Sequence, residues 1–184
     1  MAALLSARLV VFGFAFLATV LATWLTRSTR GVPPAPHRWP LTFLGRLRAG
    51  LRAGGRERAS WLGALAYGGL VSVLHFGGLH FDVYVAIAQW DLLTHALSGA
   101  GVALLLYLTF HQGIDRARPL RWILPAVLAI GAGFELYEYL FKSFWHAWSW
   151  QFYLEDTAVD LLVNAVGGGL AVAGLRVAGA AESF

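Results

Sequence analysis

The sequence predicts an all-α fold, a polytopic membrane helix bundle with five transmembrane helices. Composition is the first reason: 58% of the 184 residues are hydrophobic and 13% are charged, against roughly 25% charged in a typical soluble domain. The mean hydropathy of +0.62 is the second. The third is the presence of five separate apolar segments, each close to the length of about 20 residues that a helix needs to cross the hydrocarbon core.

The predicted spans follow one another along the chain. The first is a retained helix and not a cleaved signal peptide, because polar and basic residues 26–30 follow it in place of a small-residue cleavage site. Asp82 predicts that residues 81–90 form a loop or a partly inserted segment. The five expected helices are Leu4–Leu25, Trp61–Leu79, Leu92–Phe110, Trp122–Leu140 and Ala158–Val177.

The connection between the first two spans is rich in arginine and proline. Within it, leucines repeat at helical spacing among arginines over residues 41–52, which predicts a short interfacial helix that contacts anionic lipid. A basic loop that only determines topology is the alternative. The chain therefore divides into an N-terminal transmembrane helix (1–26), a cytoplasmic Arg/Pro-rich linker with an interfacial helix (27–60) and a four-helix transmembrane core that carries the polar site (61–184).

Arginine also gathers at residues 116–121, on the same predicted side as the linker. By the positive-inside rule that side is cytoplasmic. We therefore expect a multi-pass plasma-membrane protein, surrounded by the lipid bilayer, with its N-terminus outside and its C-terminus cytoplasmic. The formal charge of +4 reflects this orientation, so no nucleic-acid partner is expected. The sequence makes no prediction of an oligomeric state.

Ionisable and polar side chains converge in the outer halves of four predicted spans, where each is costly unless it has a role. Several share a helix face, because their spacings are i,i+3 or i,i+4. Glycines beside them predict close approach of the helices. The polar residues are His75, Asp91, His95, Glu135, Glu138, Asp156, Asp160 and Asn164, and the glycines are Gly99, Gly101, Gly131, Gly133 and Gly167 to Gly169.

Five carboxylates at one depth need a cation or shared protons, because a dry cavity disfavours their ionised forms. Lys142 is a single base and cannot balance them. Oxygen and imidazole ligands predict a divalent metal ion as the cofactor, without identifying it. We expect Glu135 to act as a catalytic base or further ligand and His75 and Asn164 to support the site. The predicted metal ligands are Asp91, His95, Glu138, Asp156 and Asp160.

For some of these residues a structural role is the alternative to a functional one. His75 alone is typical of a histidine that hydrogen-bonds between packed helices. Glu155 and Asp156 precede the predicted fifth span, where carboxylates cap a helix and favour its dipole. Glu135, Glu138 and Asp160 lie too deep in their spans for that explanation.

Three motifs in order resemble a known family. They are Trp90-Asp91-Leu-Leu-Thr-His95-Ala-Leu-Ser98-Gly99, then Phe134-Glu135-Leu-Tyr-Glu138-Tyr139, then Glu155-Asp156-Thr157-Ala-Val-Asp160-Leu-Leu-Val-Asn164-Ala-Val-Gly167-Gly168. Over residues 90–170 the chain resembles the YjdF-type small membrane proteins and, more distantly, the VanZ-like group. The resemblance implies the fold and the site residues. It implies no reaction, although VanZ-like proteins are associated with glycopeptide resistance at the cell envelope.

The sequence thus favours an integral membrane protein with an outward-facing Asp/Glu/His cluster, a divalent-metal site acting on a lipid or envelope precursor. Two alternatives remain open, a cation- or proton-coupled transporter and a non-catalytic membrane scaffold. The chain has no cysteine, which excludes thiolate metal sites and cysteine nucleophiles. Whether the protein is an enzyme is left open.

Overall fold

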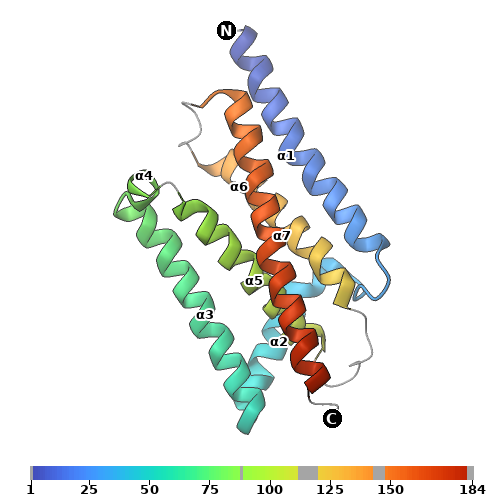
Figure 1. The fold of residues 1–184 in the computed structure, drawn as a ribbon. Coiled ribbons are helices and arrows are strands. Elements are labelled where there is room, and N and C mark those ends of the chain that lie inside the picture. Colours follow the sequence, from blue (N-terminus) through green and yellow to red (C-terminus); the bar gives the residue numbers. More distant parts are fainter. Residues whose placement is uncertain (1, 88, 112–119, 143–147, 182–184) are drawn as a thin grey trace.

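The computed structural model of the protein is a bundle of helices (Figure 1). It describes residues 2–87, 89–111, 120–142 and 148–181, and these contain no β-strand. The elements in chain order are α1 (Ala2–Ser28), η1 (Pro36–Arg38), α2 (Trp39–Arg52), α3 (Gly55–His80), α4 (Val83–Ala86), α5 (Trp90–His111), η2 (Leu120–Trp122), α6 (Ile123–Phe141) and α7 (Trp150–Ala181).

Five of these helices are long and apolar enough to cross a membrane: α1, α3, α5, α6 and α7. The predicted all-α membrane bundle is therefore confirmed. In a bilayer a helix satisfies its own backbone hydrogen bonds, which is why these apolar segments are helical. The short helix expected over 41–52 is present as α2. Residues 81–90 hold the single helical turn α4, which begins after Asp82 in the left-handed backbone region (φ 53°).

The fifth span begins earlier than predicted. The sequence placed its start at Ala158, but α7 begins at Trp150. Ser149 supports this start, because its Oγ accepts the backbone N–H of Phe152 at 3.1 Å. The capping role considered for Glu155 and Asp156 is therefore wrong, since both lie beyond the first turn of α7 and that turn has no acidic residue.

The ends of the helices alternate between two faces of the bundle. Figure 1 shows the N-terminus and α4 at one end, and α2 and the C-terminus at the other. The start of α5, the end of α6 and the start of α7 share the end with α4 (Figure 1). We call this the α4 end. The polar parts of the four core spans therefore lie toward one face, as their positions in the sequence predict.

The helices α5 and α7 make the most extensive contact in the bundle. A Cβ atom on Gly99 would collide with the carbonyl oxygen of Asn164, and one on Gly167 would collide with the carbonyl oxygen of Ala96. The two backbones approach this closely only because both positions are glycine. Gly133 and Gly169 have no neighbour within 4 Å of such an atom, so the predicted role in helix approach is wrong for these two.

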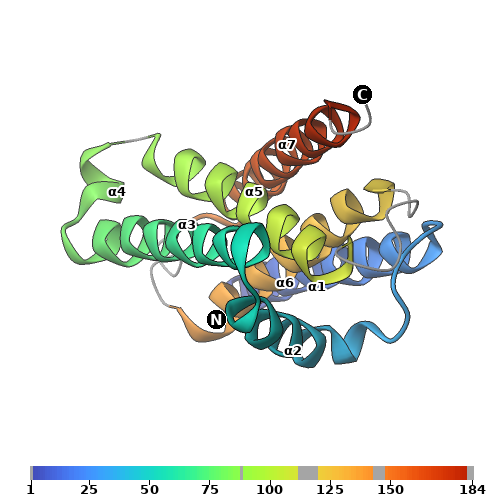
Figure 2. The same cartoon turned by 90° about the horizontal axis from the view of Figure 1, so that it is seen from below.

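The helix α3 lies at the edge of the bundle. Figures 1 and 2 both show α5 between α3 and α7. Much of the surface of α3 is exposed and apolar, which in a membrane protein is the surface that lipid covers. Its exposed large apolar residues are Leu62, Leu65, Leu70, Val73, Phe76 and Leu79.

The apolar core lies farther from the α4 end than the polar cluster does. It joins α5, α6 and α7 through buried residues that include Ala103, Val127 and Val172. Trp39 at the start of α2 packs on it, with ring centroids 5.5 Å from Trp122 and 5.3 Å from Phe110. This packing holds α5 and α7 in a fixed relation below the polar residues.

Candidate functional site

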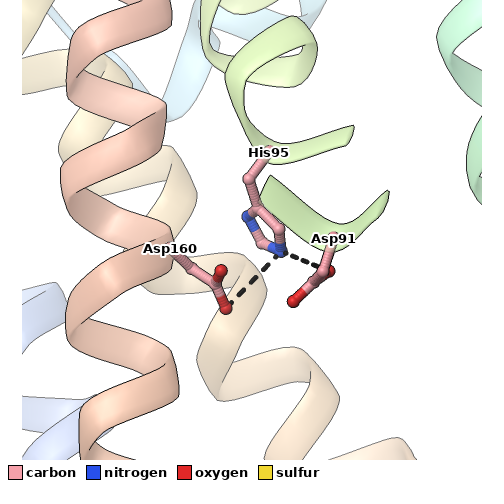
Figure 3. Close-up of side chains that lie close together, drawn as sticks. All are labelled: Asp91, His95 and Asp160. Atoms are coloured by element: carbon pink, nitrogen blue, oxygen red, sulfur yellow. Dashed lines mark ion pairs between the residues drawn. The ribbon is translucent and has the colours of Figure 1, made fainter. Parts of the chain in front are cut away.

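Three predicted ligands meet between α5 and α7. His95 Nε2 lies 3.4 Å from Asp91 Oδ1 and 3.6 Å from Asp160 Oδ2. One ligand atom from each residue lies within 4.8 Å of the others. Figure 3 shows both carboxylates pointing toward the same edge of the imidazole, Asp91 from the same helix and Asp160 from α7. We call these three residues the Asp–His–Asp group.

The Asp–His–Asp group is mostly shielded by protein. His95 is 9% exposed and Asp160 is 3% exposed, whereas the Asp91 side chain is 36% exposed. The i,i+4 spacing puts Asp91 and His95 on one face of α5. The close crossing of α5 and α7 at Gly99 and Gly167, which we call the glycine crossing, brings α7 near enough for Asp160 to complete the group. Asp91 is therefore the residue of the group that a ligand approaching from the α4 end reaches first.

Asn164 orients the imidazole from one turn further along α7. Its side-chain Nδ2 lies 3.0 Å from His95 Nδ1. The oxygen and nitrogen of an amide are assigned from the hydrogen-bond network, so the same position equally supplies Oδ1 as an acceptor. If a neutral His95 donates Nδ1–H to Oδ1, then Nε2 carries a lone pair toward the two aspartates, whereas in a protonated His95 both nitrogens donate and Asn164 again accepts. If Nδ2–H donates to Nδ1, then Nε2 carries the proton.

The remaining predicted acids do not join the Asp–His–Asp group in the part of the chain that the structure describes. Glu138 and Asp156 lie within electrostatic range of Asp91 and His95. Glu135 is 3% exposed and accepts a hydrogen bond from Thr157 Oγ1 at Oε2, at 3.4 Å. Its other oxygen, Oε1, is buried and has no hydrogen-bond partner among the described residues.

His75 takes part in a hydrogen-bonded chain that joins three helices. Its Nδ1 lies 2.8 Å from the hydroxyl of Tyr84 on α4, and that hydroxyl lies 3.2 Å from Thr94 Oγ1. Thr94 Oγ1 in turn donates to the carbonyl oxygen of Asp91 at 2.9 Å. Burial raises the pKa of Tyr84 above its ordinary value, so the phenol stays protonated and can donate.

Sequence reasoning missed Tyr84 and Thr157 as members of this polar network. Tyr84 lies in the segment that the sequence predicts to be a loop or a partly inserted segment, and Thr157 lies one turn before Asp160. The i,i+3 relation of Thr157 and Asp160 was a signal in the sequence. No local signal placed Tyr84 on His75, because that contact depends on how α4 folds back over α3 and α5.

These features define a class: an integral, multi-pass helical membrane protein with a buried acid–histidine group between two spans. Residues 8–180 match the family model described as "Predicted membrane protein (DUF2238)", and the chain belongs to this family. YjdF-type is a name of the same family, so that resemblance is confirmed, whereas the resemblance to VanZ-like proteins has no support from the match. No curated protein and no solved structure shows significant similarity to the chain.

Proposed function

We propose that the protein binds one divalent metal ion at the Asp–His–Asp group. The observation that carries the proposal is the meeting of Asp91, His95 and Asp160, whose ligand atoms lie within 4.8 Å of one another. Two carboxylates and one imidazole form a ligand set used for divalent metals. The identity of the metal stays open.

The distances within the group support this proposal. Ligand atoms bound tetrahedrally at about 2.1 Å from a metal are about 3.4 Å from one another. The separations of His95 Nε2 from the two aspartate oxygens are 3.4 and 3.6 Å. A metal would therefore be accommodated with small side-chain adjustments.

Charge also supports a divalent ion. The ionised carboxylates of Asp91 and Asp160 carry two negative charges in a mostly buried group, and a divalent cation neutralises both. A protonated His95 neutralises only one of them. That protonated state is the basis of the scaffold alternative, in which an ion pair between α5 and α7 stabilises the bundle without binding a ligand.

The chemistry that we propose is hydrolysis or transfer at a lipid or envelope precursor. Three protein ligands leave a position for water or substrate, as in catalytic metal sites, and a bound metal polarises a carbonyl or phosphoryl oxygen. Glu138 is partly exposed and lies near the group, which suits a fourth ligand or a base. Glu135 remains the proposed catalytic base, supported by its burial and its unpartnered oxygen.

We further propose that the α4 end faces outward in the plasma membrane and that the arginines of α2 contact anionic lipid on the inner side. The support is the arginine content of the linker and the exposure of Arg46, Arg48 and Arg52 on α2. Each basic residue close to an anionic surface contributes about 1 kcal/mol of attraction.

Metal analysis of the full chain purified in detergent tests the proposal. We expect about one divalent metal ion per chain in the wild type and at least a tenfold lower content in Asp160→Asn. Glu155→Gln is the matched control, because Glu155 lies on the same helix, is exposed and is outside the group. Wild-type protein that carries no metal and gains none on titration would contradict the metal centre and leave the scaffold and a proton-coupled transporter.

If metal is bound, flux measurements on sealed vesicles separate the two remaining classes. Metal-dependent release of a product from added lipid supports an enzyme. Movement of the metal or of protons across the vesicle membrane supports a transporter instead.

A further inference from the structure

A cavity of about 230 Å³ lies beside the Asp–His–Asp group. Residues of α3, α5 and α6 form its walls, and Asn164 reaches it from α7. His95 belongs to both features, with Nε2 toward the two aspartates and its ring also lining the cavity. We call this cavity the α3–α6 pocket.

The pocket opens between α3 and α6. Its exposed lining residues are all on these two helices: Ser72 and Phe76 on α3, and Ile130 and Phe134 on α6. The imidazole of His75 and the ring of Phe134 meet across this opening with centroids 6.0 Å apart. The buried lining residues, by contrast, are on α5, α6 and α7. The opening therefore faces sideways into the bilayer, beside the apolar surface of α3.

Polarity changes along the length of the pocket. His75 lies near the end of α3, and Thr94 and His95 lie near the start of α5, so these three are toward the α4 end. Val102 in the middle of α5 and Val127 near the start of α6 lie farther from it. His95 and Val102 are seven residues apart on α5, which corresponds to about 10 Å along the helix axis. A membrane lipid has the same order, with its polar group at the membrane surface and its chain toward the bilayer centre.

The volume of the pocket limits the size of the ligand that it can bind. Pockets that enclose a drug-sized ligand measure roughly 300–1,000 Å³, and this one measures about 230 Å³. It therefore accommodates one part of a larger molecule, whose remainder stays in the surrounding bilayer. The first part of one acyl chain with its polar attachment fits this description, because it enters from lipid, needs only one narrow site and leaves the rest of the chain in the bilayer.

We propose that the α3–α6 pocket binds one acyl chain of a bilayer lipid, which enters sideways between α3 and α6 and places its polar end beside His75, Thr94 and His95. The hydroxyl and imidazole groups there hydrogen-bond the ester or hydroxyl oxygens of such a lipid. The lipid is then held next to the Asp–His–Asp group. Its role as a substrate rests on the proposed metal centre, whereas its binding does not.

Native mass spectrometry of the full chain tests binding. The protein is reconstituted with a phosphatidylglycerol of one defined chain length, released into mild detergent and weighed. We expect one retained phospholipid per chain for the wild type and at least a fivefold lower retained fraction for Val102→Trp, whose indole fills the pocket. Val166→Trp is the matched control, because Val166 is 52% exposed on α7 and lies outside the pocket.

Equal lipid retention by Val102→Trp and the wild type overturns the proposal, as does a wild-type chain that retains no lipid. If Val102→Trp fails to fold, Ser98→Leu provides the same comparison with a smaller change on the same wall of the pocket. Asp160→Asn should lose metal and keep lipid. A metal-free protein that retains lipid contradicts only the metal centre, and a metal-loaded protein that retains none contradicts only the lipid site.

Discussion

Asn164 on α7 contacts the imidazole of His95 on α5 at 3.0 Å, and this contact couples helix packing to the geometry of the site. The same residue presents its backbone carbonyl to Gly99, where a side chain would collide with it. One turn of α7 therefore determines both how closely the two helices cross and where His95 Nε2 points. An orienting partner on the second imidazole nitrogen is typical of histidines that bind metal.

The first prediction concerns Asn164 as an orienting residue. Asn164→Asp keeps an acceptor for His95 Nδ1–H, so we expect metal affinity to stay within about threefold of the wild type. Asn164→Leu removes the partner and should weaken metal binding by about 10- to 100-fold. Isothermal titration with a divalent metal measures both. Loss of metal binding in Asn164→Asp, at a native unfolding midpoint, would contradict this orienting role, because that variant retains the acceptor for His95 Nδ1–H.

The second prediction concerns the glycine crossing. Gly167→Ala should destabilise the bundle by about 1–3 kcal/mol, because the added methyl group collides with the carbonyl oxygen of Ala96. Gly169→Ala meets nothing within 4 Å and should be neutral or stabilising by up to about 1 kcal/mol through helix propensity. Thermal unfolding in detergent measures the difference. An equal effect of the two substitutions would contradict the close crossing.

The third prediction separates Glu135 from the metal ligands. Glu135→Gln keeps the shape of the side chain and an acceptor for Thr157, while it removes a group that is costly to ionise when buried. We expect unchanged metal content and an unfolding midpoint no lower than that of the wild type. Thr157→Val, in contrast, leaves the carboxylate without this donor and should cost about 1–3 kcal/mol. Loss of metal in Glu135→Gln would instead make Glu135 a ligand.

The fourth prediction concerns orientation, and the absence of native cysteine makes it direct to test. Ser149 directly precedes α7, whose start is at the α4 end, and Ser28 is the last residue of α1, at the other end; both are exposed. In intact cells, Ser149→Cys should react with a membrane-impermeant thiol reagent and Ser28→Cys should not. Both should react after permeabilisation. The reverse pattern in intact cells would place the α4 end in the cytoplasm.

Much of this arrangement was predictable from local features of the sequence. Apolar segments of spanning length predict both ends of α1, α5 and α6 to within a few residues, because the bilayer imposes both length and helical structure. The helix α3 begins earlier than predicted, at Gly55 in place of Trp61, because its first turn is polar and basic. The start of α7 was less predictable from hydropathy. Ser149 caps the helix, but the first two turns after it contain aromatic and acidic residues, so their hydropathy does not indicate a membrane span. The spacing of Asp91 and His95 was sufficient to place them together, as both lie on one helix.

The sequence by itself determined the class of protein, the number of spans and the depth at which the acids gather, because hydropathy and helical period are properties of each segment alone. Only the tertiary structure decided which acids meet. The rotation and crossing of α7 against α5 bring Asp160 to His95 and leave Glu138 and Asp156 nearby but outside the group. That choice depends on contacts between distant segments, chiefly the backbone approach at Gly99 and Gly167, which no local pattern specifies.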